Sequence, residues 1–228
     1  ASGIPAPEIY VLEQEDSINA FAAGHTPANA AVAVTRGALM KLNRDQLQGV
    51  IAHEFSHVLN GDIRISIRLM GLVFGLMAVS LAGRTLIRLA RHGDKGVAPV
   101  LALGLGIAAI GQIGFWGGRL LQAWISRQRE SLADASAVQF TRNPDGLRDA
   151  LVRAAALSPA RRFANSAMEQ VAHMLFVSGT PRLLATHPPL LQRLQALESN
   201  INQAQLDSMM RRAQAQWRES TVAEPAPY

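Results

Sequence analysis

The chain has 228 residues, with 22 Lys and Arg, 17 Asp and Glu, and no Cys. The lack of cysteine excludes disulfides and thiolate ligands, so a metal site would have to use His, Asp or Glu. The sequence pI is about 10.6, but aromatic residues make up only 5% and no basic-aromatic patch indicates nucleic-acid binding. This length suits one domain over residues 1–228. The chain begins without Met or a signal-peptide pattern, so we expect a fragment or processed form.

Two segments near the N-terminus, residues 8–12 and 30–35, are rich in β-branched side chains and predict short strands. Most of the remaining chain has helical patterns. We therefore predict an α+β fold that is mainly α with a small sheet.

Residues 43–59 predict a helix that carries an HExxH motif. Asn43 can cap this helix. His53 and His57 are four residues apart, share one face and can bind one zinc ion. Glu54 then lies beside the metal as the general base that takes a proton from the attacking water. The alternative is a pair of ordinary polar helix residues, although unpaired polar side chains in an apolar stretch are costly.

A strand beside a protease cleft can bind an extended substrate through its backbone. We predict this role for the strand formed by Ala31, Val32, Ala33, Val34 and Thr35. A plain sheet strand without a substrate role is the alternative.

Two uncharged apolar runs follow, at residues 69–83 and 97–118. A helix needs about 20 apolar residues to cross a bilayer, so we predict a transmembrane hairpin over residues 69–118. The alternative is a pair of buried or interfacial helices in a soluble protein. Glycines four apart would let the two helices approach closely: Gly71 and Gly75, Gly114 and Gly118.

The third metal ligand is predicted after the hairpin, where residues 126–135 also have a helical pattern. Glu130 is the best candidate, and Asp134 on the same face could accept the outer N–H of a ligand histidine. The alternative is a solvated ion-pair face with Arg127 and Arg129.

The C-terminal part predicts packing helices and a disordered tail. Helices are expected from Asn143-Pro144 onward and over residues 164–177, 188–200 and 203–218, with the tail at residues 219–228. His187 precedes Pro-Pro; it is either a structural loop residue or a catalytic one. We assign no catalytic role to Arg193.

Several of these motifs together resemble the HtpX-like and CAAX-prenyl-protease-like zinc metallopeptidases. The resemblance rests on the HExxH motif followed by Asn60-Gly61-Asp62, the Arg-Glu-x-x-x-Asp pattern at residues 129–134, the Asn-Ala-Phe segment at residues 19–21 and the late His187-Pro-Pro. Residues 31–37 resemble the edge strand of the family.

This resemblance implies a gluzincin with His53, His57 and Glu130 as ligands and Glu54 as general base. It also implies that the loop of His187 could reach the site, to stabilise the oxyanion or to occupy the open zinc position. Further membrane segments upstream and a cytoplasmic catalytic face are expected as well.

We therefore predict a membrane-associated endopeptidase with one Zn²⁺ per chain, in the cell (inner) membrane. Its partners would be the lipid bilayer and protein or peptide substrates, namely membrane or misfolded proteins, and not nucleic acid. Two alternatives are a soluble metallopeptidase and a non-hydrolytic membrane chaperone with a structural zinc. Intact Glu54 argues against the chaperone, because a structural site needs no base.

Overall fold

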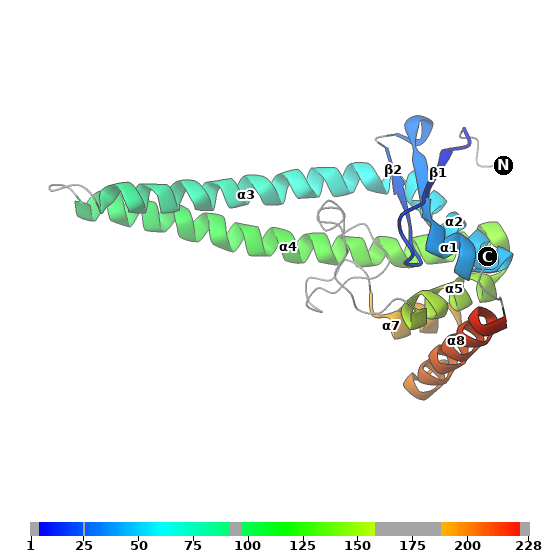
Figure 1. The fold of residues 1–228 in the computed structure, drawn as a ribbon. Coiled ribbons are helices and arrows are strands. Elements are labelled where there is room, and N and C mark those ends of the chain that lie inside the picture. Colours follow the sequence, from blue (N-terminus) through cyan, green and yellow to red (C-terminus); the bar gives the residue numbers. More distant parts are fainter. Residues whose placement is uncertain (1–4, 25, 92–96, 158–187, 224–228) are drawn as a thin grey trace.

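The computed structural model describes residues 5–24, 26–91, 97–157 and 188–223, and it confirms a mainly helical protein with a small sheet. The strands are β1 (Glu8–Leu12), β2 (Ala20–Ala23) and β3 (Ala31–Thr35), and the short helices η1 (Pro27–Asn29) and α1 (Arg36–Lys41) flank β3. The other helices are α2 (Arg44–Leu59), α3 (Asp62–Ala90), α4 (Val97–Thr141), α5 (Pro144–Leu157), α7 (Leu190–Leu197) and α8 (Gln203–Ala223). Figure 1 shows α3 and α4 projecting together from a body that holds the sheet and the remaining helices.

The sheet has the order β1-β3-β2, with β1 parallel and β2 antiparallel to β3. Ile9 of β1 and Ala22 of β2 both lie opposite Val32 of β3. The prediction that Ala31–Thr35 binds substrate as an edge strand is therefore wrong, because both backbone edges of β3 are already paired. The edge next to α2 belongs to β2, whose Ala-rich sequence lacks the β-branched residues that favour a strand.

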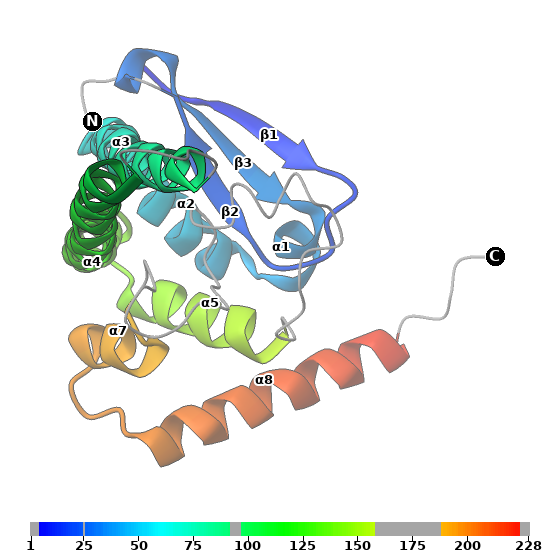
Figure 2. The same ribbon diagram turned by 90° about the vertical axis from the view of Figure 1, so that its left-hand side faces the viewer.

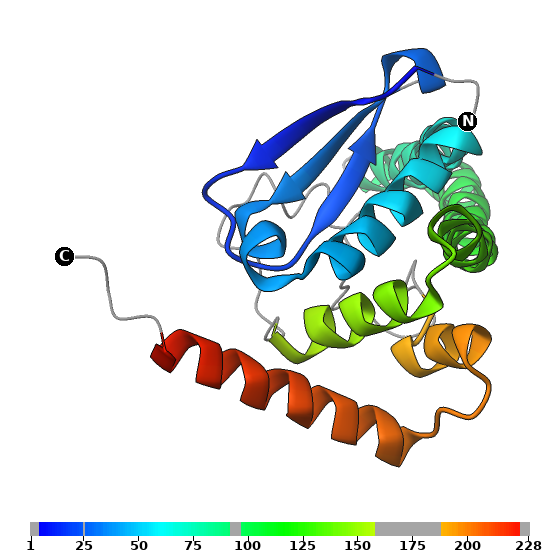
Figure 3. The ribbon, with the colours of Figure 1, turned by 90° about the vertical axis from the view of Figure 1, so that its right-hand side faces the viewer.

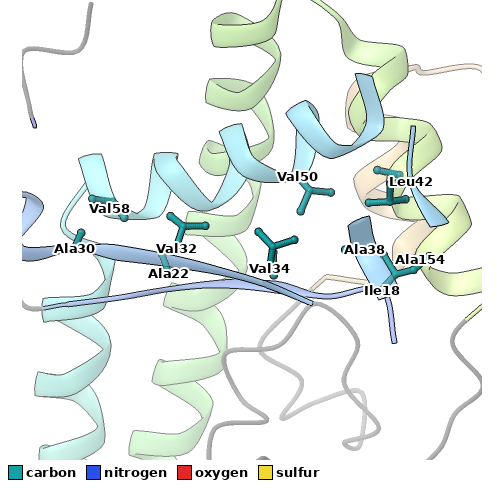
Figure 4. Close-up of a cluster of buried hydrophobic side chains, with 12 residues drawn as sticks. Ile18, Ala22, Ala30, Val32, Val34, Ala38, Leu42, Val50, Val58 and Ala154 are labelled. Atoms are coloured by element: carbon teal, nitrogen blue, oxygen red, sulfur yellow. The ribbon is translucent and has the colours of Figure 1, made fainter. Parts of the chain in front are cut away.

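Helix α2 packs across the sheet and carries the HExxH motif. Asn43 caps it as predicted: its side-chain oxygen accepts a hydrogen bond from the Gln46 amide at 2.9 Å, and Gln46 returns one to the Asn43 amide at 3.0 Å. Val50 and Val58 pack against the valines of β3 (Figure 4). The burial of this face fixes the rotation of α2, and with it the direction in which the motif points.

The body is layered beneath the sheet. Viewed along the hairpin, the sheet, α2, α5 and α8 follow one another as successive layers (Figure 2), and the opposite view shows the same order (Figure 3). Gly49 lets α2 approach α5 closely, since a Cβ on it would lie 2.8 Å from the Leu147 backbone nitrogen. α5 is therefore held directly against the helix that carries the motif.

Helices α3 and α4 pack against each other along their length and are the two helices of the described chain that are long and apolar enough to cross a membrane. Their backbones touch at glycines. A Cβ on Gly83 would lie 2.3 Å from the Ala108 nitrogen, and one on Gly111 would lie 2.3 Å from the Ser80 nitrogen. Small residues thus bring the two helices together as the two arms of a hairpin. The first arm is α3, and the second is the part of α4 that packs against it.

The predicted glycine pairs make this contact only in part. Gly71 and Gly75 have nothing within 4 Å, so that prediction is wrong, whereas Gly114 and Gly118 meet side chains of α3. Which glycines face the partner depends on the rotation of each helix, and spacing along one helix does not reveal it. The second arm and the predicted ligand helix are one unbroken helix, α4.

The C-terminal helices α5, α7 and α8 lie close to their predicted positions. α8 continues to Ala223, so the predicted disordered tail is wrong for residues 219–223. The ring of Trp217 lies under the Lys41 ammonium, with the nitrogen 5.5 Å from the ring centroid, and ties the last turns of α8 to α1. The predicted helix at 164–177 and His187 lie outside the described residues.

Candidate metal centre

Three side chains from two helices converge at one point. His53 and His57 lie one turn apart on α2, and Glu130 reaches them from α4. The two His Nε2 atoms are 3.2 Å apart, and the Glu130 oxygens lie 3.6 Å from His53 Nε2 and 3.5 Å from His57 Nε2. A tetrahedral site with metal–ligand distances of about 2.0–2.2 Å has ligand–ligand edges of about 3.3–3.6 Å. The oxygen near His53 is Oε2 and the oxygen near His57 is Oε1, so one Glu130 oxygen faces each histidine at about this edge length. One ligand atom from each of the three residues lies within 4.8 Å of the others, close enough for the three side chains to hold one metal ion.

Each histidine is held at its outer nitrogen by a carboxylate. Asp134 Oδ1 lies 2.9 Å from His53 Nδ1, and Asp62 Oδ2 lies 2.7 Å from His57 Nδ1. A carboxylate at Nδ1 fixes the tautomer, so that the Nε2 lone pair points at the metal position. Asp134 is placed as the sequence predicted, whereas Asp62 was noted only as part of a motif.

Each carboxylate is held in turn by an arginine. Arg193 of α7, which is 4% exposed, contacts Asp134 through Nε at 2.9 Å and Nη2 at 2.6 Å, and its Nη1 lies 3.4 Å from Glu130 Oε2. Arg129 Nε lies 2.9 Å from Asp62 Oδ1. The buried negative charge around the two histidines is thus compensated from two directions.

Burial and pairing set the protonation of these groups. Burial alone would raise the pKa of Asp134, but the hydrogen bond with His53 and the charge of Arg193 hold this pKa below its ordinary value. Burial lowers the pKa of His53, which keeps that ring neutral, the form that binds metals. The same burial would lower the pKa of His57, but hydrogen bonds with Asp62 and Glu130 and the charge of Glu54 raise it to about 10. A bound cation would have to displace that proton.

Glu54 is buried next to the three donors, and its Oε2 accepts a hydrogen bond from the Ala22 amide of β2 at 3.1 Å. Burial raises the pKa of Glu54 to about 7. A carboxyl group that titrates near neutral pH can both take and return a proton, which is what a general acid–base catalyst requires. The contact with Ala22 also places β2, and not β3, beside the base.

The structure brings together five of the residues predicted for the site: His53, Glu54, His57, Glu130 and Asp134. Sequence reasoning missed Asp62, Arg129, Arg193 and Ala22 as parts of it. One signal for Asp62 was available: Gly61 has φ +68 and turns the chain just after the metal-binding helix, so the next residue can fold back onto His57. The partners of the two arginines are distant in sequence and left no local signal.

The donor set fits a divalent metal ion. Two imidazole nitrogens and a carboxylate suit zinc and related transition metals, and three protein ligands leave a fourth position open, as in catalytic sites.

Comparisons with known proteins support this interpretation. Peptidase family M48 matches residues 1–201. The protein named Protease HtpX homolog from Streptococcus gordonii is 41% identical over 207 residues, which cover 85% of this chain and 67% of that protein. Proteins of the same name from Streptococcus thermophilus and Thermoanaerobacter pseudethanolicus are 37% and 38% identical over 210 residues, covering 86% and 87% of this chain and 68% of each relative. No solved structure matches the chain. These matches confirm the resemblance noted in the sequence, and the chain belongs to peptidase family M48, a family of metalloproteases.

Proposed function

We propose that the chain is a zinc endopeptidase that works at a membrane surface. The spacing of His53, His57 and Glu130, with Glu54 beside them, carries the proposal. One Zn²⁺ per chain would be held by the first three residues and would supply Lewis-acid activation of water and of the scissile carbonyl. Residues 1–228 would form one peptidase domain around this site.

The protein side of the mechanism centres on Glu54. Its carboxylate takes a proton from the attacking water and returns it to the leaving amine. Asp134 and Asp62 hold the imidazoles of His53 and His57 in place throughout. The role of His187 as an oxyanion donor or metal-site residue stays a prediction from the sequence.

Substrate would bind along β2. Within the described residues this strand pairs only with β3, and its Ala22 amide points at Glu54. An extended peptide added to this edge would lie with its backbone next to the base. Substrate binding thus moves from the predicted β3 to the neighbouring strand.

The hairpin would anchor the enzyme in the bilayer. Large apolar side chains on α3 and α4 are exposed, among them Phe74, Ile110 and Ile113 at 66%, 69% and 74%. The helices are about 44 and 68 Å long by helical rise, and a hydrocarbon core is about 30 Å thick. A soluble protein would have to cover these side chains, whereas lipid solvates them directly. Membrane and misfolded proteins are then the natural substrates.

The catalytic body would face the cytoplasm from the cell (inner) membrane, as the family resemblance implies. Because the chain has no cysteine, single cysteines can test this. In sealed cells, Arg91→Cys at the distal end of α3 should react with an impermeant maleimide, and the exposed Ser131→Cys of α4 should not. The reverse pattern would contradict the orientation.

Metal analysis and a casein-cleavage assay in detergent test the hydrolytic function. Glu54→Gln should keep the metal content of the parent and lose activity about 10²- to 10⁴-fold, the usual contribution of a general base. Glu219→Gln, an exposed change on α8, is the matched control and should cleave like the parent. Cleavage by Glu54→Gln at the control rate would show that Glu54 is not the base. A parent protein that binds metal but does not cleave casein would favour the non-hydrolytic alternative.

A further inference from the structure

Asp62 lies at the junction of the metal centre and the hairpin. It is the first residue of α3, it is 4% exposed, and it follows the left-handed Gly61. One of its carboxylate oxygens contacts His57 Nδ1 at 2.7 Å, and the other contacts Arg129 Nε at 2.9 Å. A single side chain thus links a candidate metal ligand to an arginine on the other arm.

Arg129 completes the link between the two arms. Its side chain is 14% exposed, and its Nη2 lies 3.4 Å from Ser66 Oγ, one turn after Asp62 on α3. The next residue on α4 is Glu130, the third donor of the metal centre. The first turn of α3 and the part of α4 around Arg129 therefore contact each other next to the metal position. We call this end of the two helices the base of the hairpin.

The Asp62–Arg129 ion pair lies in a part of the sequence that is otherwise almost entirely basic. Asp94 is the only acidic residue in the sequence between Asp62 and Glu130, and eight arginines and one lysine lie in the same stretch. Arg64, Arg68, Arg119 and Arg127 lie on the halves of α3 and α4 nearer to Asp62, and their mutual repulsion opposes close approach of the two helices there. Asp62 offsets it from a buried position, where its interaction with a cation is least screened by salt.

The two histidines differ in what holds them. The carboxylate at His53, Asp134, is backed by Arg193 from α7, in the body of the protein. The carboxylate at His57 is backed by Arg129, from the hairpin. The position of His57 therefore depends on both arms, through Asp62 on α3 and Arg129 on α4, whereas His53 is held through Asp134 on α4 and Arg193 on α7 and has no partner on α3 among these contacts.

We propose that Asp62 and Arg129 form a positioning pair that holds His57 in its metal-binding orientation and couples the metal centre to the spacing of the hairpin arms at their base. The proposal rests on the proposed function, because it assumes that His57 binds metal. If the arms part, Asp62 must release either His57 or Arg129. A lipid environment or a substrate helix that separates the arms would thereby weaken the site.

The test uses the full chain in detergent and two readouts that do not depend on catalysis. Zn²⁺ affinity is measured by competition with a chromophoric chelator, and ligand geometry by the d–d absorption of Co²⁺ bound at the site. Asp62→Asn keeps the size of the side chain and removes its charge, and should weaken Zn²⁺ binding about 10- to 100-fold, as lost outer partners of ligand histidines do. Arg129→Gln should weaken binding about 10-fold and shift the Co²⁺ bands in the same direction.

Two further variants isolate the pair. Arg129→Lys restores the positive charge without the planar fork and should recover part of the affinity. Arg64→Gln removes an exposed cation from the same end of α3 and should bind Zn²⁺ within about twofold of the parent. If Arg129→Gln does not fold, as judged by its thermal unfolding, Arg129→Lys still separates the outcomes, since a role for Arg129 requires altered Co²⁺ bands.

An Arg129 variant with the affinity and Co²⁺ spectrum of Arg64→Gln would overturn the proposal, even if Asp62→Asn were impaired. Failure of the proposed function has a different signature, because the parent itself would then bind no stoichiometric metal or Glu54→Gln would remain active.

Discussion

The metal centre buries polar side chains, whereas the hairpin exposes apolar ones. Around the metal position the buried residues are polar or charged, including His53, Glu54, Glu130, Asp134 and Arg193, whereas large apolar side chains on the hairpin are exposed. The first region is held together by matched charges and the second by close backbone contact at glycines. The metal centre should therefore be sensitive to the loss of charge, and the hairpin to added volume.

One helix belongs to both regions. α4 runs unbroken from the apolar arm to Glu130 and Asp134. No loop separates the apolar arm from Glu130 and Asp134 on this helix. A displacement of α4 caused by a change in the packing of the arm can therefore move these two side chains. This continuity is why we expect the two regions to be coupled, although they are stabilised in different ways.

The largest effect on stability is expected at Arg193. Arg193→Ala would leave Asp134 and Glu130 buried without its charge, and breaking such a buried pair costs about 3–5 kcal/mol. The free energy of unfolding in detergent, measured by denaturant titration, should fall by this amount. Arg148→Ala is the matched control: Arg148 likewise pairs with carboxylates, those of Asp145, Asp149 and Glu198, but near the surface. Its loss should cost about 0–1 kcal/mol, and equal costs would contradict the comparison.

Removal of the metal should have the next largest effect. Metal bound only by the folded state stabilises it by about 2.7 kcal/mol at a concentration 100 times Kd. Treatment with a chelator should lower the unfolding temperature reversibly, and added Zn²⁺ should restore it. The variant Glu130→Ala should show a much smaller response, because it lacks one of the three donors. The same chelator response in parent and variant would place the metal elsewhere.

Local patterns predicted the parts of the site that lie on one helix. The four-residue spacing of His53 and His57 defines their geometry once the helix forms, and the Asn43 cap is likewise a local contact confirmed by the structure. Glu130 and Asp134 could be chosen because they share a helix face. The lengths of the apolar runs predicted the two long helices for a similar reason.

Contacts between distant elements could not be predicted in this way. The central place of β3 depends on strand pairing with β1 and β2, which no single strand encodes. Arg193 was left without a role because its partner Asp134 lies 59 residues earlier in the chain. In the hairpin, Gly71 and Gly75 have the spacing of a contact motif but point away from the partner helix.

The smallest of these effects, and the one that tests the hairpin alone, is expected at Gly111. A Cβ at this position would lie 2.3 Å from the Ser80 nitrogen, so Gly111→Ala must push the arms apart. Overpacking of this kind costs about 1–3 kcal/mol, to be read from denaturant unfolding in detergent. Gly106 lies on the same helix with nothing within 4 Å, and Gly106→Ala should be neutral or stabilise by up to about 1 kcal/mol through helix propensity. If both variants behave alike, the arms are not in backbone contact at Ser80. If Gly111→Ala also lowers Zn²⁺ affinity and Gly106→Ala does not, displacement in the arm reaches the metal centre through α4.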